Sequence, residues 1–133
     1  MLKETLREEI QRDTTINKES INTDMLNQPI ILSKYTKLLL SRTGDMRDAK
    51  RDMARIYFTA FKQYKEKYNV VLTKAETDIY ASADDKVQAQ QKIIDTYQGE
   101  IDELSKAIDN MKQMYWSARL YLDYCEYLKG NKS

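Results

Sequence analysis

Positively charged and aromatic side chains alternate along residues 47–68 at a spacing that brings them to one face of a helix. At about 100° per residue, six of them fall inside one sector of about 80°, namely Arg47, Arg51, Arg55, Phe58, Lys62 and Lys65. We call these six residues the basic face. Cations that follow phosphates, combined with rings that stack on bases, suit single-stranded nucleic acid. The candidate DNA-binding residues are therefore Arg47, Lys50, Arg51, Arg55, Phe58, Phe61, Lys62, Lys65 and Lys67.

The same residues allow a structural interpretation. Phe58 and Phe61 could belong to a core, and the cations could pair with Asp48, Asp52 or the acidic C-terminal third of the chain. Charged runs are often only a solvated surface. The residues alone leave both interpretations open.

Charge is segregated along the chain although the net charge is only +1. Residues 34–74 hold eleven Lys and Arg against four Asp and Glu, whereas residues 1–33 carry −2 and residues 75–133 carry −4. A concentrated positive segment indicates a polyanion or an acidic partner. Neutralisation by the acidic C-terminal segment, within one subunit or between two, is the alternative.

Residues for catalysis are scarce. Histidine is absent, and the glycines stand alone, so no phosphate-binding loop is formed. We interpret the carboxylate groups Asp84–Asp85 and Glu100/Asp102/Glu103 as solubilising residues on helix faces. Cys125 lies on an apolar seam, where burial is the expected role, and a single cysteine indicates a reducing compartment. We expect no enzymatic activity, no metal and no cofactor.

The elements that carry these residues are predicted to be helices, in one all-α domain spanning residues 1–133. Three Gly and one Pro are few for sheets or turn-rich folds. Residues 1–28 are predicted to form a short helix ending near Asp13 and then an irregular connector over residues 14–28. Leu2, Leu6 and Ile10 are spaced four apart, which places them on one face of the short helix. Residues 29–74 form the long basic central region, with Pro29 in the first turn of a helix, Gly44 as a possible break and Asn69 at its end. An apolar elbow of uncertain structure follows at residues 70–72.

Residues 75–133 are predicted to contain a long amphipathic helix for oligomerisation. Apolar residues repeat every seven positions from Tyr80 to Leu122 and from Ala83 to Cys125, and Gln90 is the polar seam residue that fixes register. The apolar face widens after Met111, and Gly130 is a candidate C-cap. A small chain with a stripe it cannot bury alone favours a homo-oligomer. The expected interface residues are Ile101, Leu104, Ile108, Met111, Met114, Tyr115, Ala118, Tyr121, Leu122, Cys125 and Leu128.

The location expected from the sequence is the cytosol. No apolar run approaches the roughly 20 residues that a membrane span needs, and the charged N-terminus lacks the apolar region of a signal peptide. We therefore expect a soluble protein that does not enter a membrane.

Several segments resemble, in order, those of the UvsY family of recombination mediators of large tailed bacteriophages. They are LREEIQRD, SKYTKLL at residues 33–39, KAETDIYASAD at residues 74–84, and the C-terminal KQMYWSARLYLDYCEYLKGN. The last contains Tyr115–Trp116, Arg119, Asp123–Tyr124 and Gly130. In one departure, the family has Lys-Ala-Arg just before an aromatic pair, whereas this chain has FTAFKQY at residues 58–64 with cations on both sides. The loop that follows is also shorter.

The resemblance implies an all-helical protein that forms a ring-like homo-oligomer through its C-terminal helices, with six or seven subunits. It also implies binding to single-stranded DNA, help in displacing the phage single-stranded-DNA-binding protein, and loading of a UvsX-type recombinase. The implied location is the cytoplasm of the infected bacterial host. Two other interpretations remain open: a non-catalytic coiled-coil scaffold or assembly protein, and an RNA-binding helical adaptor.

Overall fold

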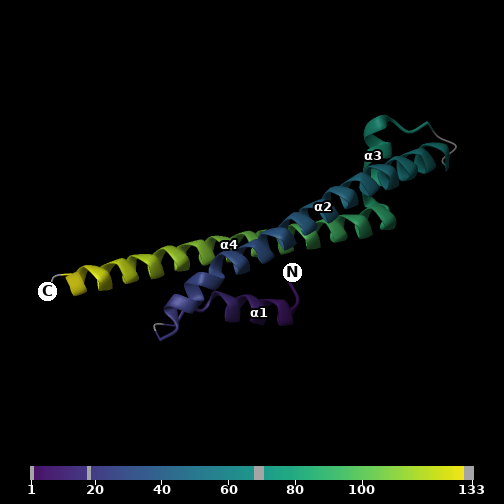
Figure 1. The fold of residues 1–133 in the computed structure, drawn as a ribbon. Coiled ribbons are helices and arrows are strands. Elements are labelled where there is room, and N and C mark those ends of the chain that lie inside the picture. Colours follow the sequence, from purple (N-terminus) through teal and green to yellow (C-terminus); the bar gives the residue numbers. More distant parts are fainter. Residues whose placement is uncertain (1, 18, 68–70, 131–133) are drawn as a thin grey trace. The chain divides into compact units, whose positions relative to one another are not determined.

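The computed structural model describes residues 2–17, 19–67 and 71–130. Within these ranges the chain forms four helices and no strand, which confirms the all-α prediction (Figure 1). They are α1 (Glu4–Thr14), α2 (Ile21–Lys67), α3 (Lys74–Ala83) and α4 (Asp85–Gly130). The chain divides into two compact units, Met1–Leu40 with Ile101–Ser133 and Ser41–Glu100, and each is described by itself.

The start of the central helix lies earlier than predicted. The predicted connector over residues 14–28 is wrong beyond residue 20, because α2 begins at Ile21 and Pro29 lies inside it. The Asp24 carboxylate accepts hydrogen bonds from the Ser20 hydroxyl (2.9 Å) and the Asn17 N–H (3.1 Å). These polar side chains organise the helix start instead of prolonging a loop. Gly44 does not break α2, and the predicted end at Asn69 lies outside the described residues.

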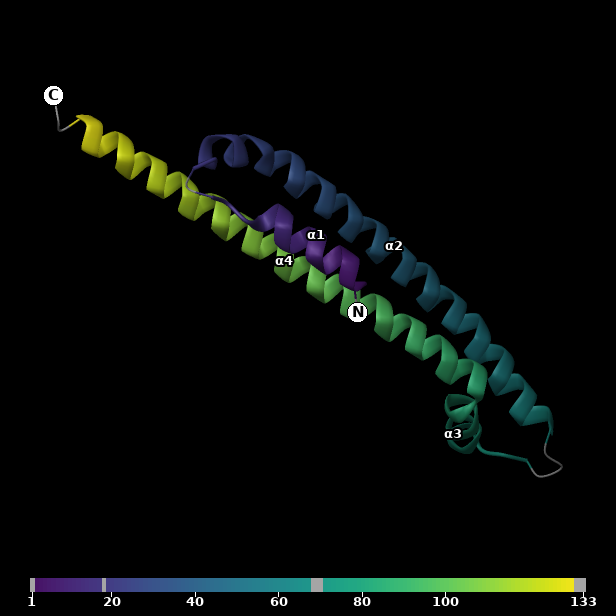
Figure 2. The ribbon, with the colours of Figure 1, turned by 90° about the horizontal axis from the view of Figure 1, so that it is seen from below.

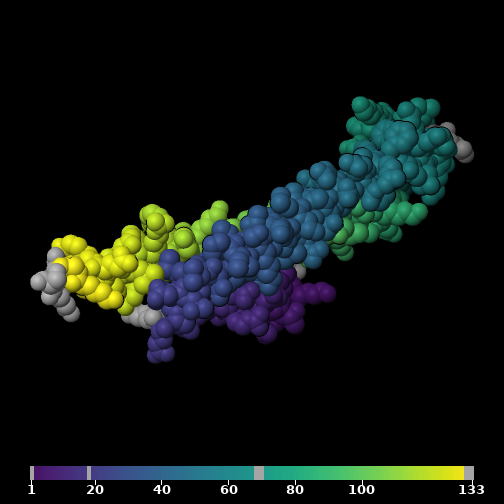
Figure 3. Space-filling view, viewed as in Figure 1, coloured from purple at the N-terminus to yellow at the C-terminus, as the bar shows by residue number. Residues whose placement is uncertain are grey.

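The core of the first unit joins α1 to parts of α2 and α4. Its fully buried side chains include Tyr35, Leu104 and Met111, and the α1 stripe predicted at Leu6 and Ile10 packs against them. Within this unit, Figure 2 shows α1 alongside α4, and Figure 3 shows its side chains against those of α2. The sequence prediction of a short apolar-striped N-terminal helix is confirmed.

Polar contacts also fasten α1 in place. The Arg7 guanidinium donates two hydrogen bonds to Glu103, at 2.8 and 3.1 Å, and the Tyr35 hydroxyl donates to Asp13 at 2.6 Å. Lys34 pairs with both Glu9 and Asp13. Burial raises the pKa of Asp13, but the hydrogen bond from Tyr35 and the Lys34 ammonium outweigh it and hold that pKa below its usual value.

The core of the second unit brings α3 against α2 and the start of α4. Ala60, Ala81 and Val87 are buried, and partly buried α2 side chains pack around them. The hydroxyls of Tyr57 and Tyr64 donate hydrogen bonds to Asp78 and to Asp84 respectively, the second at 3.0 Å. These contacts fix the α2 segment whose outer surface carries the basic face.

The predicted heptad seam is divided between two helices. Asp84 has an extended backbone at the end of α3, and its carboxylate caps α4 by accepting the Lys86 N–H at 2.9 Å. Tyr80 and Ala83 therefore lie on α3, and the seam of α4 begins at Val87. The Gln90 amide donates to the Ala49 carbonyl at 2.8 Å, so this polar seam residue bonds to α2 of the same chain.

None of the described helices combines the length and the apolar character that crossing a bilayer would need.

Candidate nucleic-acid interface

The basic face lies on the outer side of α2 in the Ser41–Glu100 unit. All six of its residues are exposed, whereas α2 turns Met53, Ile56 and Ala60 toward the core of the unit. Core packing on one side of the helix thus determines which side carries the cations. The predicted clustering of these residues on one helical face is consistent with their burial pattern.

Most of the candidate cations have no acidic partner among the residues that the structure describes. In the described part of the chain, no carboxylate lies within 4.0 Å of the five residues Arg47, Lys50, Arg51, Lys62 and Lys65. Arg55 is different, because its guanidinium pairs with Asp52 one turn earlier. The Lys67 ammonium lies 6.0 Å from the centroid of the Tyr64 ring. Neutralisation within the chain, the alternative interpretation, therefore applies to Arg55 and not to the face as a whole.

The two phenylalanines have different environments. The Phe58 side chain is among the exposed large hydrophobic groups, with 66% of its surface accessible. Phe61 is half-buried, packs on the Ala60–Ala81–Val87 core and lies 6.2 Å from the Tyr57 ring, between centroids. The exposed ring of Phe58 is accessible for stacking on a base. Phe61 instead belongs to the core, as the structural interpretation of the sequence allowed.

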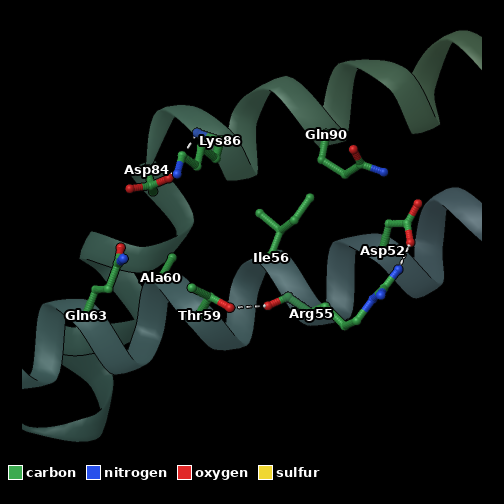
Figure 4. A pocket seen from close by; sticks show the side chains of 9 residues that line it. All are labelled: Asp52, Arg55, Ile56, Thr59, Ala60, Gln63, Asp84, Lys86 and Gln90. Carbon is green, nitrogen blue, oxygen red and sulfur yellow. Dashed lines mark hydrogen bonds and ion pairs between the residues drawn. The ribbon is translucent and has the colours of Figure 1, made fainter.

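A groove of about 450 Å³ borders the basic face on one side (Figure 4). It lies between α2 and the first turns of α4, and Ile56 points into the space between them. Its lining residues are Asp52, Arg55, Ile56, Thr59, Ala60, Gln63, Asp84, Lys86 and Gln90. Sequence reasoning missed Gln63 and Lys86 as neighbours of the face. The heptad spacing that aligns α4 with α2 was the available signal for Lys86, next to Val87.

A second groove of about 450 Å³ borders the other side of the same α2 segment. Lys50, Met53 and Tyr57 line it from α2, together with residues from α3 and α4. Its amides are engaged: Gln88 donates to the Ser82 carbonyl at 2.6 Å, and Gln91 donates to Asp95 at 2.9 Å. The basic face is thus a ridge between two grooves of different chemistry.

The residues predicted at an oligomer interface divide by exposure. Four of them are buried by contacts within this chain and are not available to a second subunit: Leu104, Ile108, Met111 and Ala118. Ile101, Tyr115, Leu122 and Cys125 are half-buried, and Met114, Tyr121 and Leu128 are each 41% exposed. A second exposed apolar stripe on α4 was missed, although its helical spacing is visible in the sequence: Trp116, Leu120, Tyr124 and Tyr127.

Three carboxylates predicted to be solubilising have structural partners instead. Asp84 caps α4 and accepts from Tyr64. Glu100 lies 3.0 Å from the Arg42 guanidinium with 16% of its side chain exposed. The hydrogen bond from Arg7 lowers the pKa of Glu103. Among the residues that the structure describes, no group of three or more His, Cys, Asp and Glu is arranged to hold a metal ion.

Comparison with known proteins shows the fold. No protein-family model and no curated protein matches the sequence. Three crystal structures of the bacteriophage T4 recombination mediator protein UvsY, in lattice types IV, II and I, match with TM-scores of 0.84, 0.81 and 0.82. They are 20%, 20% and 18% identical to this chain, cover 96%, 97% and 93% of it, and are each covered over 98% of their own length. The chain therefore has a UvsY-like fold over nearly its whole length.

Proposed function

We propose that this protein is a non-catalytic recombination mediator that binds single-stranded DNA through the basic face of α2. In this role it helps displace a phage single-stranded-DNA-binding protein and loads a UvsX-type recombinase, in the cytoplasm of an infected bacterium. The observation that carries the proposal is a row of exposed cations beside exposed Phe58, of which all but Arg55 have no carboxylate partner in the described ranges. The UvsY-like fold supports the role of mediator.

Single strands fit this surface better than duplex DNA for a physical reason. Any row of cations binds phosphates favourably, because each contact releases condensed counterions into the solution. Only an unpaired strand can also turn a base onto an exposed ring such as Phe58, which adds roughly 1–3 kcal/mol for each stacked base. The basic face offers both interactions on one helix.

An oligonucleotide titration tests the binding step. Fluorescence anisotropy would compare labelled single-stranded DNA, duplex DNA and RNA of equal length over a series of salt concentrations. We expect tightest binding to single-stranded DNA, with an affinity that falls steeply with salt. Absence of binding to DNA at low salt would favour the scaffold interpretation, and preference for RNA would favour the adaptor interpretation.

The mediator step needs its own measurement. Single-stranded DNA coated with the phage single-stranded-DNA-binding protein should bind recombinase faster when this protein is added. The control is a variant with Arg47→Gln and Arg51→Gln, which keeps the helix because both positions are exposed. If this variant accelerates recombinase binding as much as the parent protein does, recombinase loading does not depend on the basic face.

We further propose that the protein is a homo-oligomer assembled through the C-terminal part of α4, as a ring of six or seven subunits. Leu128 and the stripe from Trp116 to Tyr127 remain exposed in the single chain. Apolar patches of this kind mark interaction surfaces. A ring would present several basic faces to one strand, so later contacts become intramolecular and affinity rises with strand length.

Sedimentation tests the assembly. Leu122→Lys with Leu128→Lys puts unpaired charges into the proposed interface, which costs several kcal/mol, and should yield a smaller species. Glu126→Lys on the same helix is the matched control, since Glu126 is exposed and polar. If the double variant sediments like the parent protein, this part of α4 is not the assembly element.

A further inference from the structure

We propose that the groove between α2 and the start of α4 is a nucleobase-binding subsite, in which a base of the bound strand lies over Ile56 while Lys86 holds a neighbouring phosphate. The inference rests on the proposed binding of single-stranded DNA and adds a second contact surface to it. The groove is the one lined by Arg55, Gln63 and Lys86 (Figure 4).

Its position is the first argument. Arg55 belongs to the basic face and also lines the groove, so the two surfaces share an edge. Thr59, Gln63 and Ile56 follow from that edge toward the core, on the same helix. A strand whose phosphates follow the cations of the face therefore has this groove directly beside its bases.

The charge of the groove is the second argument. Arg55 and Lys86 are balanced by Asp52 and Asp84, so the lining has no net charge. The neighbouring basic face carries five cations and no carboxylate of its own. A phosphate is attracted to the face, and the uncharged part of a nucleotide is favoured in the groove, where half-buried Ile56 and buried Ala60 supply apolar surface.

Unengaged polar groups are the third argument. In the described residues, neither the Gln63 amide nor the Lys86 ammonium has a hydrogen-bond or ion-pair partner, whereas Gln88 and Gln91 in the opposite groove are both engaged. An amide both donates and accepts, which matches the edge of a base. Lys86 lies in the first turn of α4, where the helix dipole disfavours a cation. Helix stability therefore does not account for its position, and its ammonium is available to a phosphate at the edge of the groove.

A groove-filling variant tests the base contact. The affinities of a single-stranded oligonucleotide and of an abasic strand of equal length are compared in the parent, in Gln63→Trp and in Gln91→Trp. Gln91→Trp is the matched control because it puts the same side chain into the opposite groove. In the parent, loss of the bases should weaken binding by about fivefold or more, the low end for one stacked base. Gln63→Trp should reduce that ratio by about the same factor, and Gln91→Trp should leave it unchanged.

A charge variant tests the phosphate contact without filling the groove. Lys86→Gln should lower the slope of log affinity against log salt by about 0.7, the contribution of one phosphate on a single strand. Lys92→Gln removes the same charge from an exposed position of α4 outside the groove and should leave the slope unchanged. Circular dichroism checks that each variant remains helical.

The outcomes separate this inference from the proposed function. Failure of the parent to bind any single strand would overturn both. Binding by the parent with an unchanged base-to-abasic ratio in Gln63→Trp, or with equal slopes for Lys86→Gln and Lys92→Gln, would overturn the subsite alone. A reduced ratio in Gln91→Trp and not in Gln63→Trp would transfer the base to the opposite groove and overturn the subsite proposed here.

Discussion

Arg51→Gln and Arg55→Gln remove the same charge from adjacent turns of α2, yet we expect them to weaken binding of single-stranded DNA unequally. The Arg51 guanidinium has no carboxylate within 4.0 Å among the described residues, whereas Arg55 pairs with Asp52. DNA must compete with Asp52 for the second arginine and not for the first. The two substitutions therefore measure how much a neighbouring carboxylate reduces the contribution of an arginine to DNA binding.

The magnitude follows from counterion release. One phosphate contact on a single strand contributes about 0.7 to the slope of log affinity against log salt, so Arg51→Gln should lower the slope by that amount. When the salt concentration rises fourfold, the affinity of the variant should therefore fall by a factor about 2.6 times smaller than that of the parent. The Arg55–Asp52 pair is exposed, with 78% and 49% of the side-chain surfaces accessible, and such a pair contributes at most about 1 kcal/mol, or about fivefold. Arg55→Gln should therefore change the slope by less than Arg51→Gln does.

Asp52→Asn completes the test. It releases Arg55, so affinity should rise by up to about fivefold and the salt slope should steepen. In that background, Arg55→Gln should have the full effect of Arg51→Gln. The assay is fluorescence anisotropy with a short labelled oligonucleotide over a salt series. Equal slopes for Arg51→Gln and Arg55→Gln, or no effect of Asp52→Asn, would refute the reasoning.

Three further predictions concern the rings, the core and acid stability. Phe58→Ala should weaken single-stranded DNA binding by about 5- to 150-fold in the same titration, whereas Phe61→Ala should chiefly lower the melting temperature because Phe61 packs on the core. Leu104→Ala should lower the free energy of unfolding by about 2–5 kcal/mol in urea denaturation, whereas Leu40→Ala, at 66% exposed, should change it by at most about 0.5 kcal/mol. Because the folded pKa of Asp13 lies below its unfolded value, its contribution is present above about pH 4 and lost as pH falls; Asp13→Asn should therefore flatten the acid limb of a stability–pH profile.

Helix content and the side of α2 that carries the cations could be predicted because each depends on local spacing. Leu6 and Ile10, four residues apart, pack as that spacing predicts. The start of α2 was misplaced because Ser20 and Asp24 have side chains typical of turns, and in this chain the same groups cap a helix. Local propensity does not distinguish these two uses of one side chain.

The seam of α4 shows a different limit. A heptad pattern predicts that a stripe is buried, and it does not state by what. Leu104 and Met111 are covered by α1 and α2 of their own chain, whereas Leu128 on the same helix stays exposed. Similarly, the spacing of the cations does not show that Asp52 pairs with Arg55 while Arg51 has no such partner in the described ranges. Both distinctions depend on contacts that only the folded chain defines.

The division of the chain into units has a consequence for its synthesis on the ribosome. The unit Ser41–Glu100 is continuous in sequence, whereas the first unit joins Met1–Leu40 to Ile101–Ser133. The helix that carries Leu6 and Ile10 is translated before its partners on α4. The contacts of Arg7 with Glu103 and of Leu2 with Leu104 cannot form until those later residues have been added. At about 5–20 residues per second, the 96 positions from Arg7 to Glu103 take roughly 5–19 s to translate. During that interval the apolar side of α1 lacks its partners on α4 and is exposed to aggregation and proteolysis.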